Sequence, residues 1–297
     1  MMWGNFINYE GAVFRPPSEA SSLILQITVG CKHNQCTFCS MYKGKSFHIP
    51  SKEDIMSSID AGVKEYPMVR RIFLADGDAL ACDTDLLSEI LQTIYQRFPH
   101  LERVGIYGGP KDILNKTPQE LSYLKDQGLG IVYLGVESGS EDVLKLIGKG
   151  VTPEEMIAAG QKVVASGLKL SCTIILGLGG KQAFEEHAFE TGKVLSAINP
   201  HFIGTLTLML EPEAPLSKKV QSGEFTLLNP WECLRELGLI IQGLELRDCL
   251  FRSNHASNYL PLKAHFPYDK ELLLSTIKGV IAENRAEVLR PENWREL

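Results

Sequence analysis

Three cysteines near the amino-terminal end of the chain have the spacing of a metal-binding loop. Cys31, Cys36 and Cys39 form a C-x4-C-x2-C pattern. Thiolates are the ligands that soft metal centres prefer, and three of them on one short loop can bind a single centre. Structural zinc sites and iron–sulfur clusters usually have four protein ligands. A set of three therefore leaves one position of the metal centre open for a small molecule.

The cysteines alone leave two other interpretations open. His33 lies between the first two cysteines and could be the fourth ligand of a zinc site. The three residues could also be reduced thiols that bind no metal. A zinc protein, or an iron–sulfur protein without catalysis, would then act as a scaffold or an electron carrier.

The cysteine loop follows a stretch that predicts a buried strand. Leu23–Val29 is apolar, contains several β-branched residues and is followed by Gly30. Further strands are predicted downstream at residues 71–75, 104–107, 130–136, 168–176 and 202–210. Helices are predicted between the strands at residues 51–66, 83–98, 117–128, 140–147, 152–166 and 183–197. Six strands that alternate with helices favour an α/β fold with a parallel sheet.

The last third of the chain has a different pattern. Residues 211–230 are expected to be loop-rich, and helices are predicted at residues 231–244 and 269–284. A short strand is predicted at residues 250–252. This part is therefore predicted to be an extension of the region in which strands and helices alternate.

Polar and glycine-rich residues gather where the predicted strands end. In parallel α/β sheets the functional residues lie at the carboxyl ends of the strands. The residues found at these ends are Cys31–Cys39, Asp76-Gly77-Asp78, Tyr107, Glu137-Ser138, Gly177–Gly180 and Leu208-Met209. We therefore expect the functional site at this edge of the sheet.

The cysteine loop resembles that of the radical S-adenosylmethionine (SAM) superfamily. The resemblance rests on the three cysteines after a strand and on Phe38, the aromatic residue before Cys39. The usual family spacing is C-x3-C-x2-C, so this chain has one more residue between its first two cysteines. Coproporphyrinogen dehydrogenase-like and methylthiotransferase-like catalytic cores are the nearest subfamilies. The resemblance covers roughly residues 20–215.

The resemblance implies a fold, a cofactor set and a reaction. The fold would be an open (β/α)6 partial barrel over residues 23–215, with a lead-in segment at residues 1–22 and a helical cap at residues 216–297. Cys31, Cys36 and Cys39 would hold a [4Fe–4S] cluster whose fourth iron binds SAM. SAM would accept one electron, from a donor such as a flavodoxin or ferredoxin, and yield a 5′-deoxyadenosyl radical. That radical would abstract hydrogen from a small, polar substrate.

The resemblance also implies which residues surround SAM. Phe38 would pack by the adenine and Asp76-Gly77-Asp78 would receive the methionine amino group. The other residues implied in SAM binding are Glu137, Ser138, Lys149, Gly177, Leu208 and Met209. Each of these segments also has an ordinary structural interpretation, as an Asp-Gly turn, a helix cap, a solvated lysine or core. The glycines at 177–180 also allow a nucleotide-binding hydrolase or transferase.

A polar stretch in the extension is the candidate substrate site. The residues expected to bind substrate there are Arg252, Asn254, His255 and Asn258, together with Tyr107 after the third strand. His255 and Tyr107 are also candidates for catalysis, as are the thiols of Cys82 and Cys249. The alternatives are a hydrogen-bonded connecting loop for the polar stretch and buried, reduced cysteines for the two thiols.

Composition limits the class of protein. A chain of 297 residues with 44% hydrophobic residues can bury the core of a barrel. The net charge of −6 argues against a nucleic-acid partner. No apolar stretch approaches the length of a membrane span, and an odd number of cysteines, seven, favours a reducing compartment. We therefore expect a cytoplasmic enzyme without a membrane partner.

Overall fold

The computed structural model describes residues 7–296, which form two compact units. The first unit contains the residues up to Asn34, Met41–Leu134 and Lys162–Lys169. The second unit contains Gln35–Ser40, Gly135–Gln161 and the residues from Leu170 onward. The division expected from the sequence, at residues 1–22, 23–215 and 216–297, stays a prediction.

The first unit carries the first parallel strands. They are β1 (Leu23–Gln26), β2 (Arg71–Ala75), β3 (Arg103–Tyr107) and the beginning of β4 (Leu129–Glu137). Their parallel pairing aligns Leu25 with Leu74 and Ile106 with Val132. The helices are α1 (Lys52–Glu65), α2 (Thr84–Arg97), α3 (Pro110–Asn115) and α4 (Pro118–Asp126).

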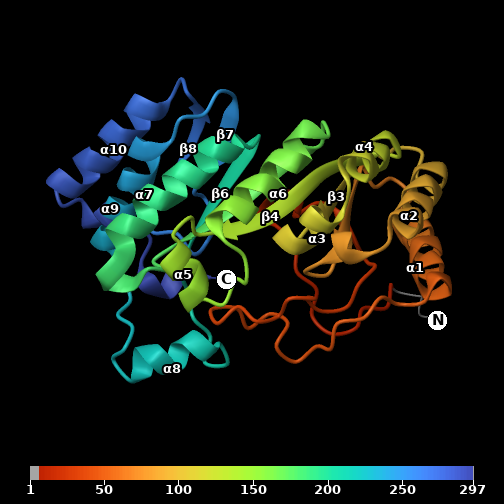
Figure 1. The fold of residues 1–297 in the computed structure, drawn as a ribbon, viewed down its shortest axis with the longest axis horizontal. Coiled ribbons are helices and arrows are strands. Elements are labelled where there is room, and N and C mark those ends of the chain that lie inside the picture. The colour runs from red at the N-terminus through yellow and green to blue at the C-terminus, as the bar shows by residue number, and fades with distance from the viewer. Residues whose placement is uncertain (1–6, 297) are drawn as a thin grey trace. The chain divides into compact units, whose positions relative to one another are not determined.

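The second unit carries the later strands. They are β5 (Lys169–Leu176), β6 (Phe202–Thr207), β7 (Cys249–Arg252) and β8 (Lys263–Phe266). The first three are parallel, and β8 runs antiparallel to β7. The helices are α5 (Glu141–Leu146), α6 (Pro153–Ala165, which ends in the first unit), α7 (Gly180–Ile198), α8 (Pro215–Gln221), α9 (Pro230–Gly243) and α10 (Lys270–Ala282). Helix α9 packs against both α7 and α10 (Figure 1).

The strands follow one another in the sheet in the order of the sequence, from β1 to β8. The α/β class and the open, mostly parallel sheet are therefore confirmed. No helix among residues 7–296 combines the length and the apolar character that a membrane span requires.

Caps specified by the sequence define where several helices begin. Ser51 caps α1, and its side chain accepts a hydrogen bond from the Asp54 amide at 3.1 Å. Thr117 and Glu120 form both bonds of a capping box at α4. Such caps satisfy amides that have no partner inside the helix. The predicted starts of α1 and α4 are confirmed.

Two strands are shorter than predicted. β1 ends at Gln26 rather than Val29, because the amides of Ile27 and Thr28 both donate to the Ala75 carbonyl, which stops the regular ladder. β6 ends at Thr207 rather than Leu210, and Leu208 and Leu210, beyond its end, contribute to an apolar cluster. An apolar sequence pattern does not distinguish residues that are buried within a strand from residues that are buried beyond its end.

Other elements were not predicted. The four-residue β8, which pairs with β7, is such an element and completes a sheet of eight strands, whereas β7 is the strand predicted at residues 250–252. Residues 211–230 contain α8, whose Leu216 is buried in the apolar cluster. Pro110 begins α3, for which the sequence predicted no helix. Helix α7 begins at Gly180, with a kink at Ala183, where the sequence predicted its start. These are short elements that tertiary contacts stabilise.

Candidate active site

The seven cysteines fall into two classes. All lie in the described part of the chain and none forms a disulfide. Those of the C-x4-C-x2-C loop are half-buried, and the other four are buried. Burial raises the pKa of the Cys82, Cys233 and Cys249 thiols to about 12 and also raises that of Cys172. These four stay protonated at neutral pH, which favours a structural role for Cys82 and Cys249.

The loop cysteines have the donor chemistry of an iron–sulfur site. Thiolates are the usual protein ligands of such clusters, and partly exposed thiols remain accessible to iron. Cys31 lies in the first unit, whereas Cys36 and Cys39 lie in the second. Within residues 7–296, no three His, Cys, Asp or Glu side chains are arranged as a metal site. The chemistry of the three thiols fits an iron–sulfur cluster. Their role as its ligands stays a prediction.

The segment with the last two cysteines is anchored within the second unit. The Thr37 amide donates to the Ile147 carbonyl at 2.8 Å, and the Leu216 amide donates to the Thr37 carbonyl at 2.8 Å. Phe38 packs against the apolar cluster that contains Leu208. The structure thus places two of the residues expected near the adenine, Phe38 and Leu208, in the same apolar environment.

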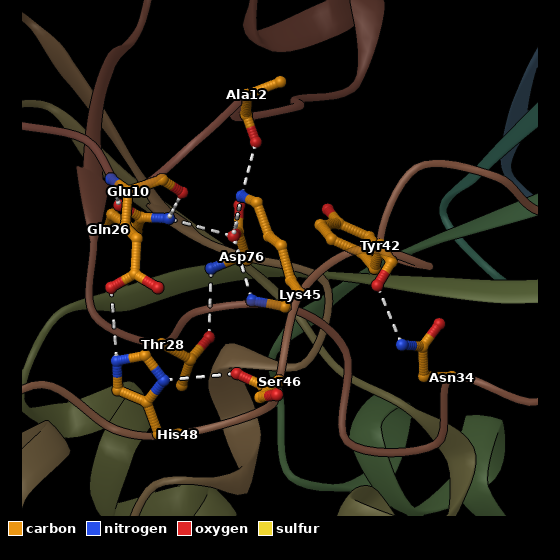
Figure 2. Close-up of polar contacts among 11 residues, drawn as sticks. Glu10, Ala12, Gln26, Thr28, Asn34, Tyr42, Lys45, Ser46, His48 and Asp76 are labelled. Atoms are coloured by element: carbon orange, nitrogen blue, oxygen red, sulfur yellow. Dashed lines mark hydrogen bonds and ion pairs between the residues drawn. The ribbon is translucent and has the colours of Figure 1, made fainter.

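Asp76 holds the start of the cysteine loop in the first unit (Figure 2). Its Oδ2 accepts hydrogen bonds from Gln26 Nε2 at 2.9 Å, from the Gly30 amide at 3.1 Å and from Lys45 Nζ at 2.8 Å. Gly30 immediately precedes Cys31, and Lys45 follows the last cysteine of the loop. One carboxylate oxygen therefore fixes residues on both sides of the loop. Its second oxygen, Oδ1, is buried and has no hydrogen-bond partner among the described residues.

The lead-in segment contributes to the same network. Lys45 Nζ also donates to the Ala12 carbonyl at 2.6 Å. The Glu10 amide donates to Gln26 Oε1 at 2.8 Å, and the Glu10 carboxylate lies 3.4 Å from His48 Nε2 (Figure 2). Sequence reasoning missed Gln26 and Lys45, since neither lies in a recognisable motif.

The backbone at Gly77 lies too close to neighbouring side chains to leave room for a side chain of its own. A Cβ atom at this position would lie 2.6 Å from the Tyr42 ring and 3.2 Å from Cys31 Cβ. Tyr42 is buried, so the ring has little room to move. A glycine therefore fits the segment after β2 because the backbone passes directly beside Tyr42 and the first cysteine, and the predicted contact of Gly77 with SAM stays a prediction.

Asp78 belongs to a group of three charged side chains. Burial, followed by the neighbouring Asp112 carboxylate, raises the pKa of Asp78 to about 7. The Gly109 amide donates to Asp78 Oδ1 at 2.9 Å, and Lys32 Nζ lies 2.6 Å from Asp112 Oδ1. Lys32 directly follows Cys31. Asp112 and Lys32 were not among the predicted site residues, and only their positions in the fold reveal them.

Glu137 and Lys149 form an ion pair at the end of β4. Lys149 Nζ lies 3.0 Å from Glu137 Oε1, and both side chains are about nine-tenths buried. Glu137 has a left-handed backbone, with φ 63°. Its carboxylate folds back over Gly135, where a Cβ would lie 2.1 Å from Oε1. The structure therefore brings together two residues that were expected to contact SAM.

The serines after β4 cap a helix. Ser140 caps α5 by accepting from the Val143 amide at 3.3 Å and donates to Glu186 at 2.9 Å. The Ser138 hydroxyl accepts from the Ser140 amide at 3.0 Å. Both serines are buried. The capping interpretation is confirmed for Ser140, and Ser138 supports the cap.

The turn after β5 lies against the end of β6. Gly177 has φ +86°, a left-handed conformation that favours glycine. A Cβ on Gly177 would be 3.6 Å from Leu208 Cβ. The next residue, Met209, is half-buried. Gly177 and Leu208, both expected near the adenine, are therefore neighbours.

Some residues of the polar stretch after β7 form hydrogen bonds within the protein. Asn258 Nδ2 donates to the Thr205 carbonyl at 2.6 Å, and Asn258 Oδ1 accepts from Thr207 Oγ1 at 2.8 Å. His255 is half-buried, and burial followed by the nearby Arg290 charge lowers its pKa. Its Nδ1 lies 2.9 Å from the Ser257 hydroxyl. The hydrogen bonds of the Asn258 side chain thus fit a connecting loop, which was the alternative to a substrate-binding role.

The other predicted substrate residues have different surroundings. Arg252 and Asn254 are exposed in the second unit. Tyr107 is half-buried in the first unit, where its ring contacts Phe73 edge-on at 4.7 Å between centroids. The roles of these residues in substrate binding stay predictions.

Comparisons with known proteins place the chain among enzymes of one kind. The family model of the Radical SAM superfamily matches residues 25–190. The chain is 28% identical over 173 residues to 4'-phospho-dehydrooxetanocin synthase of Priestia megaterium, covering 52% of this chain and 23% of that protein. It thus spans about a quarter of that relative's length.

Solved structures show the same fold. Methylornithine synthase (PylB) matches with a TM-score of 0.56 at 15% identity, covering 86% of this chain and 68% of that chain. Coproporphyrinogen III oxidase (HemN) from Escherichia coli, a radical SAM enzyme, matches with a TM-score of 0.54 at 16% identity, covering 74% of this chain and 50% of that chain. At these identities the likeness concerns the fold alone.

Proposed function

Because the chain belongs to the radical SAM superfamily, we propose that it uses a [4Fe–4S] cluster and SAM to abstract hydrogen from a small, polar substrate. Members of this family are enzymes that use these two cofactors. Cys31, Cys36 and Cys39 would hold the cluster. The observation that carries the proposal is that only these three cysteines are partly exposed, within the residues that match the family.

When bound, the cluster supplies one electron to SAM, which releases methionine and a 5′-deoxyadenosyl radical. The electron would come from a donor such as a flavodoxin or ferredoxin. The protein contributes binding, orientation and exclusion of water. The catalysis specific to this chain therefore depends on the residues that hold SAM and substrate.

Several segments of the chain are proposed to bind SAM. Asp78, with the Gly77 backbone, would receive the methionine amino group, since a carboxylate beside a close backbone suits an ammonium. Asp76 uses one oxygen to hold the cysteine loop and leaves Oδ1 for this group. Lys149 would contact the SAM carboxylate, oriented by Glu137 and with Ser138 beside it.

The adenine would lie in an apolar environment. Phe38 packs against the cluster that includes Leu208, and Gly177 lies beside Leu208. Met209 follows directly. Apolar walls and a glycine without a side chain suit a flat aromatic base, which would be held by stacking and apolar contact.

The substrate would be recognised by side chains at the end of β7 and directly after it. Arg252 and Asn254 are exposed, and half-buried His255, whose pKa is lowered by burial, is neutral at pH 7 and could accept a proton. Asn258 would hold this loop through its two bonds to β6 rather than contact substrate. Tyr107 is proposed to line the substrate site as well. These side chains favour a polar small molecule.

The test is anaerobic reconstitution of the full chain with iron and sulfide, followed by addition of SAM and a reductant. The proposal predicts a brown protein that forms 5′-deoxyadenosine, with more formed when a fraction containing the substrate is added. A colourless zinc protein, or a brown protein that leaves SAM intact under these conditions, would contradict it.

A further inference from the structure

A buried carboxylate from the carboxyl-terminal part of the chain contacts the turn after β5. Glu236, on α9, is completely buried. Its Oε2 accepts a hydrogen bond from the Gly177 amide at 2.6 Å, and its Oε1 lies 2.8 Å from His187 Nδ1 on α7. One side chain therefore links the turn to two helices.

His187 forms a hydrogen bond with the Glu236 carboxylate. Its side chain is completely buried, and its Nε2 has no hydrogen-bond partner among the described residues. A buried carboxylate is costly unless hydrogen-bonded groups surround it. The hydrogen bond from His187 fixes the orientation of Glu236, so that its other oxygen meets the Gly177 amide.

The turn is tightly packed at its α7 end, whereas at Gly177 a Cβ would meet no atom nearer than 3.6 Å, so the Gly177 peptide is the freer part. Gly177 is left-handed, and Gly179 lies so close to α7 that a Cβ there would be 2.9 Å from the Ala183 carbonyl oxygen and 3.1 Å from His187 Cβ. The peptide that Glu236 holds is therefore part of a turn packed tightly against α7. A change at Glu236 would act first on the direction of the Gly177 amide.

Glu236 lies outside the part of the chain that matches the family, which ends at residue 190. It reaches the turn only because α9 packs against α7 (Figure 1). Through the hydrogen bond to Gly177, the carboxyl-terminal extension thus contacts the part of the chain that matches the family.

We propose that Glu236 is a positioning residue for SAM, which holds the Gly177–Gly180 turn in the conformation that receives the adenine. His187 orients the Glu236 carboxylate. This inference rests on the proposed function, because it assigns the adenine to the turn beside Leu208. It adds that the carboxyl-terminal extension determines how well SAM binds.

The test compares three variants of the reconstituted full chain. Glu236→Ala removes the acceptor for the Gly177 amide. Glu236→Gln keeps a carbonyl that accepts from Gly177 and an amide that can donate to His187 Nδ1. Ile240→Ala, at another completely buried position of α9, is the packing control. Iron content, melting temperature and the Kd for SAM are measured for each.

The proposal predicts about tenfold weaker SAM binding for Glu236→Ala, the effect of one lost hydrogen bond to a charged group. Glu236→Gln should bind within about threefold of the original protein. Ile240→Ala should lower the melting temperature and leave the Kd unchanged. Equal SAM affinity in Glu236→Ala and the original protein would overturn the proposal, as would a Glu236→Gln variant that binds as poorly as Glu236→Ala.

Hydrogen exchange provides a measurement that needs no variant. SAM should slow exchange in the peptide that contains Gly177–Gly180 of the reconstituted original protein, and the absence of any such protection would also overturn the proposal. If the original protein neither binds nor cleaves SAM, the proposed function itself fails. If it cleaves SAM while Glu236→Ala binds SAM normally, only the role of Glu236 fails.

Discussion

Lys45 Nζ lies 2.8 Å from Oδ2 of Asp76, a carboxylate that is completely buried. The same oxygen accepts from the Gly30 amide, directly before the first loop cysteine (Figure 2). An ion pair between a residue after β2 and a residue after the cysteine loop thus fixes the loop to the sheet. Because the pair is buried, the loss of either partner leaves an uncompensated charge or unpaired donors.

The first prediction concerns this pair. Lys45→Met should destabilise the protein by about 3 kcal/mol, the effect of breaking a buried ion pair. For a chain of 297 residues that corresponds to a fall of about 5 °C in the melting temperature. Adding Asp76→Asn to Lys45→Met should recover part of the loss, since the buried charge is then removed. Chemical denaturation of the single and double variants measures both effects, and a single variant as stable as the original protein would refute the buried-pair account.

The second prediction concerns pH. The pKa of Asp78 is raised to about 7 in the folded protein, whereas an unfolded aspartate titrates near 4. The folded state therefore binds more protons between these values, and its stability should fall as pH rises from about 4 to 7. Asp78→Asn should remove about 2 kcal/mol of the decrease in unfolding free energy between pH 5 and pH 8. Parallel denaturation curves with the same pH dependence in both proteins would show that Asp78 titrates normally.

The third prediction concerns the Glu137–Lys149 pair. Gly135→Ala places a Cβ 2.1 Å from Glu137 Oε1, so the carboxylate must move away from its position beside Lys149. We expect SAM binding to weaken about tenfold through the lost charge-assisted hydrogen bond, with iron content unchanged.

Gly204→Ala in β6 is the matched control. An added Cβ at Gly204 meets no atom within 4 Å, so this variant should bind SAM normally. Titration of the two variants with SAM measures the affinity of each. Normal affinity in Gly135→Ala would place SAM away from the end of β4.

The fourth prediction separates two residues of the polar stretch after β7. Asn258→Ala removes two buried hydrogen bonds to β6 and should cost about 2 kcal/mol of stability. His255→Ala, at a half-buried position, should keep the melting temperature and SAM affinity but lose substrate turnover. If His255→Ala instead lowers stability and every activity together, the histidine only supports the loop.

The sequence was sufficient for the parts of the fold that local patterns specify. Ser51 and Thr117 mark helix starts through caps formed within three residues, and apolar stretches marked the strands from β2 to β6. Short elements such as β8 and α3 have too few residues for a periodic pattern, and tertiary pairing decides whether they form. The fold class was therefore predictable, whereas the number of strands was not.

Candidate site residues could be proposed from the sequence where they lie in a motif. The three loop cysteines, Asp76–Asp78 and Gly177 follow strand ends, which the alternation of elements reveals. Lys45 and Glu236 could not be found in this way, because their partners lie 31 and 59 residues away in the sequence. Such pairs depend on how the strands and helices pack, which no local pattern encodes.

The central claim is that the C-x4-C-x2-C loop holds an iron–sulfur cluster. The most direct measurement is the iron and sulfide content of anaerobically reconstituted cysteine variants, together with their absorption spectra. Alanine at Cys31, Cys36 or Cys39 should each remove a ligand and abolish the brown chromophore. Alanine at buried Cys82 or Cys249, where the thiols stay protonated, should leave about four iron atoms per chain. Unchanged iron in the three loop variants, or loss of iron only in the buried-cysteine variants, would contradict the account.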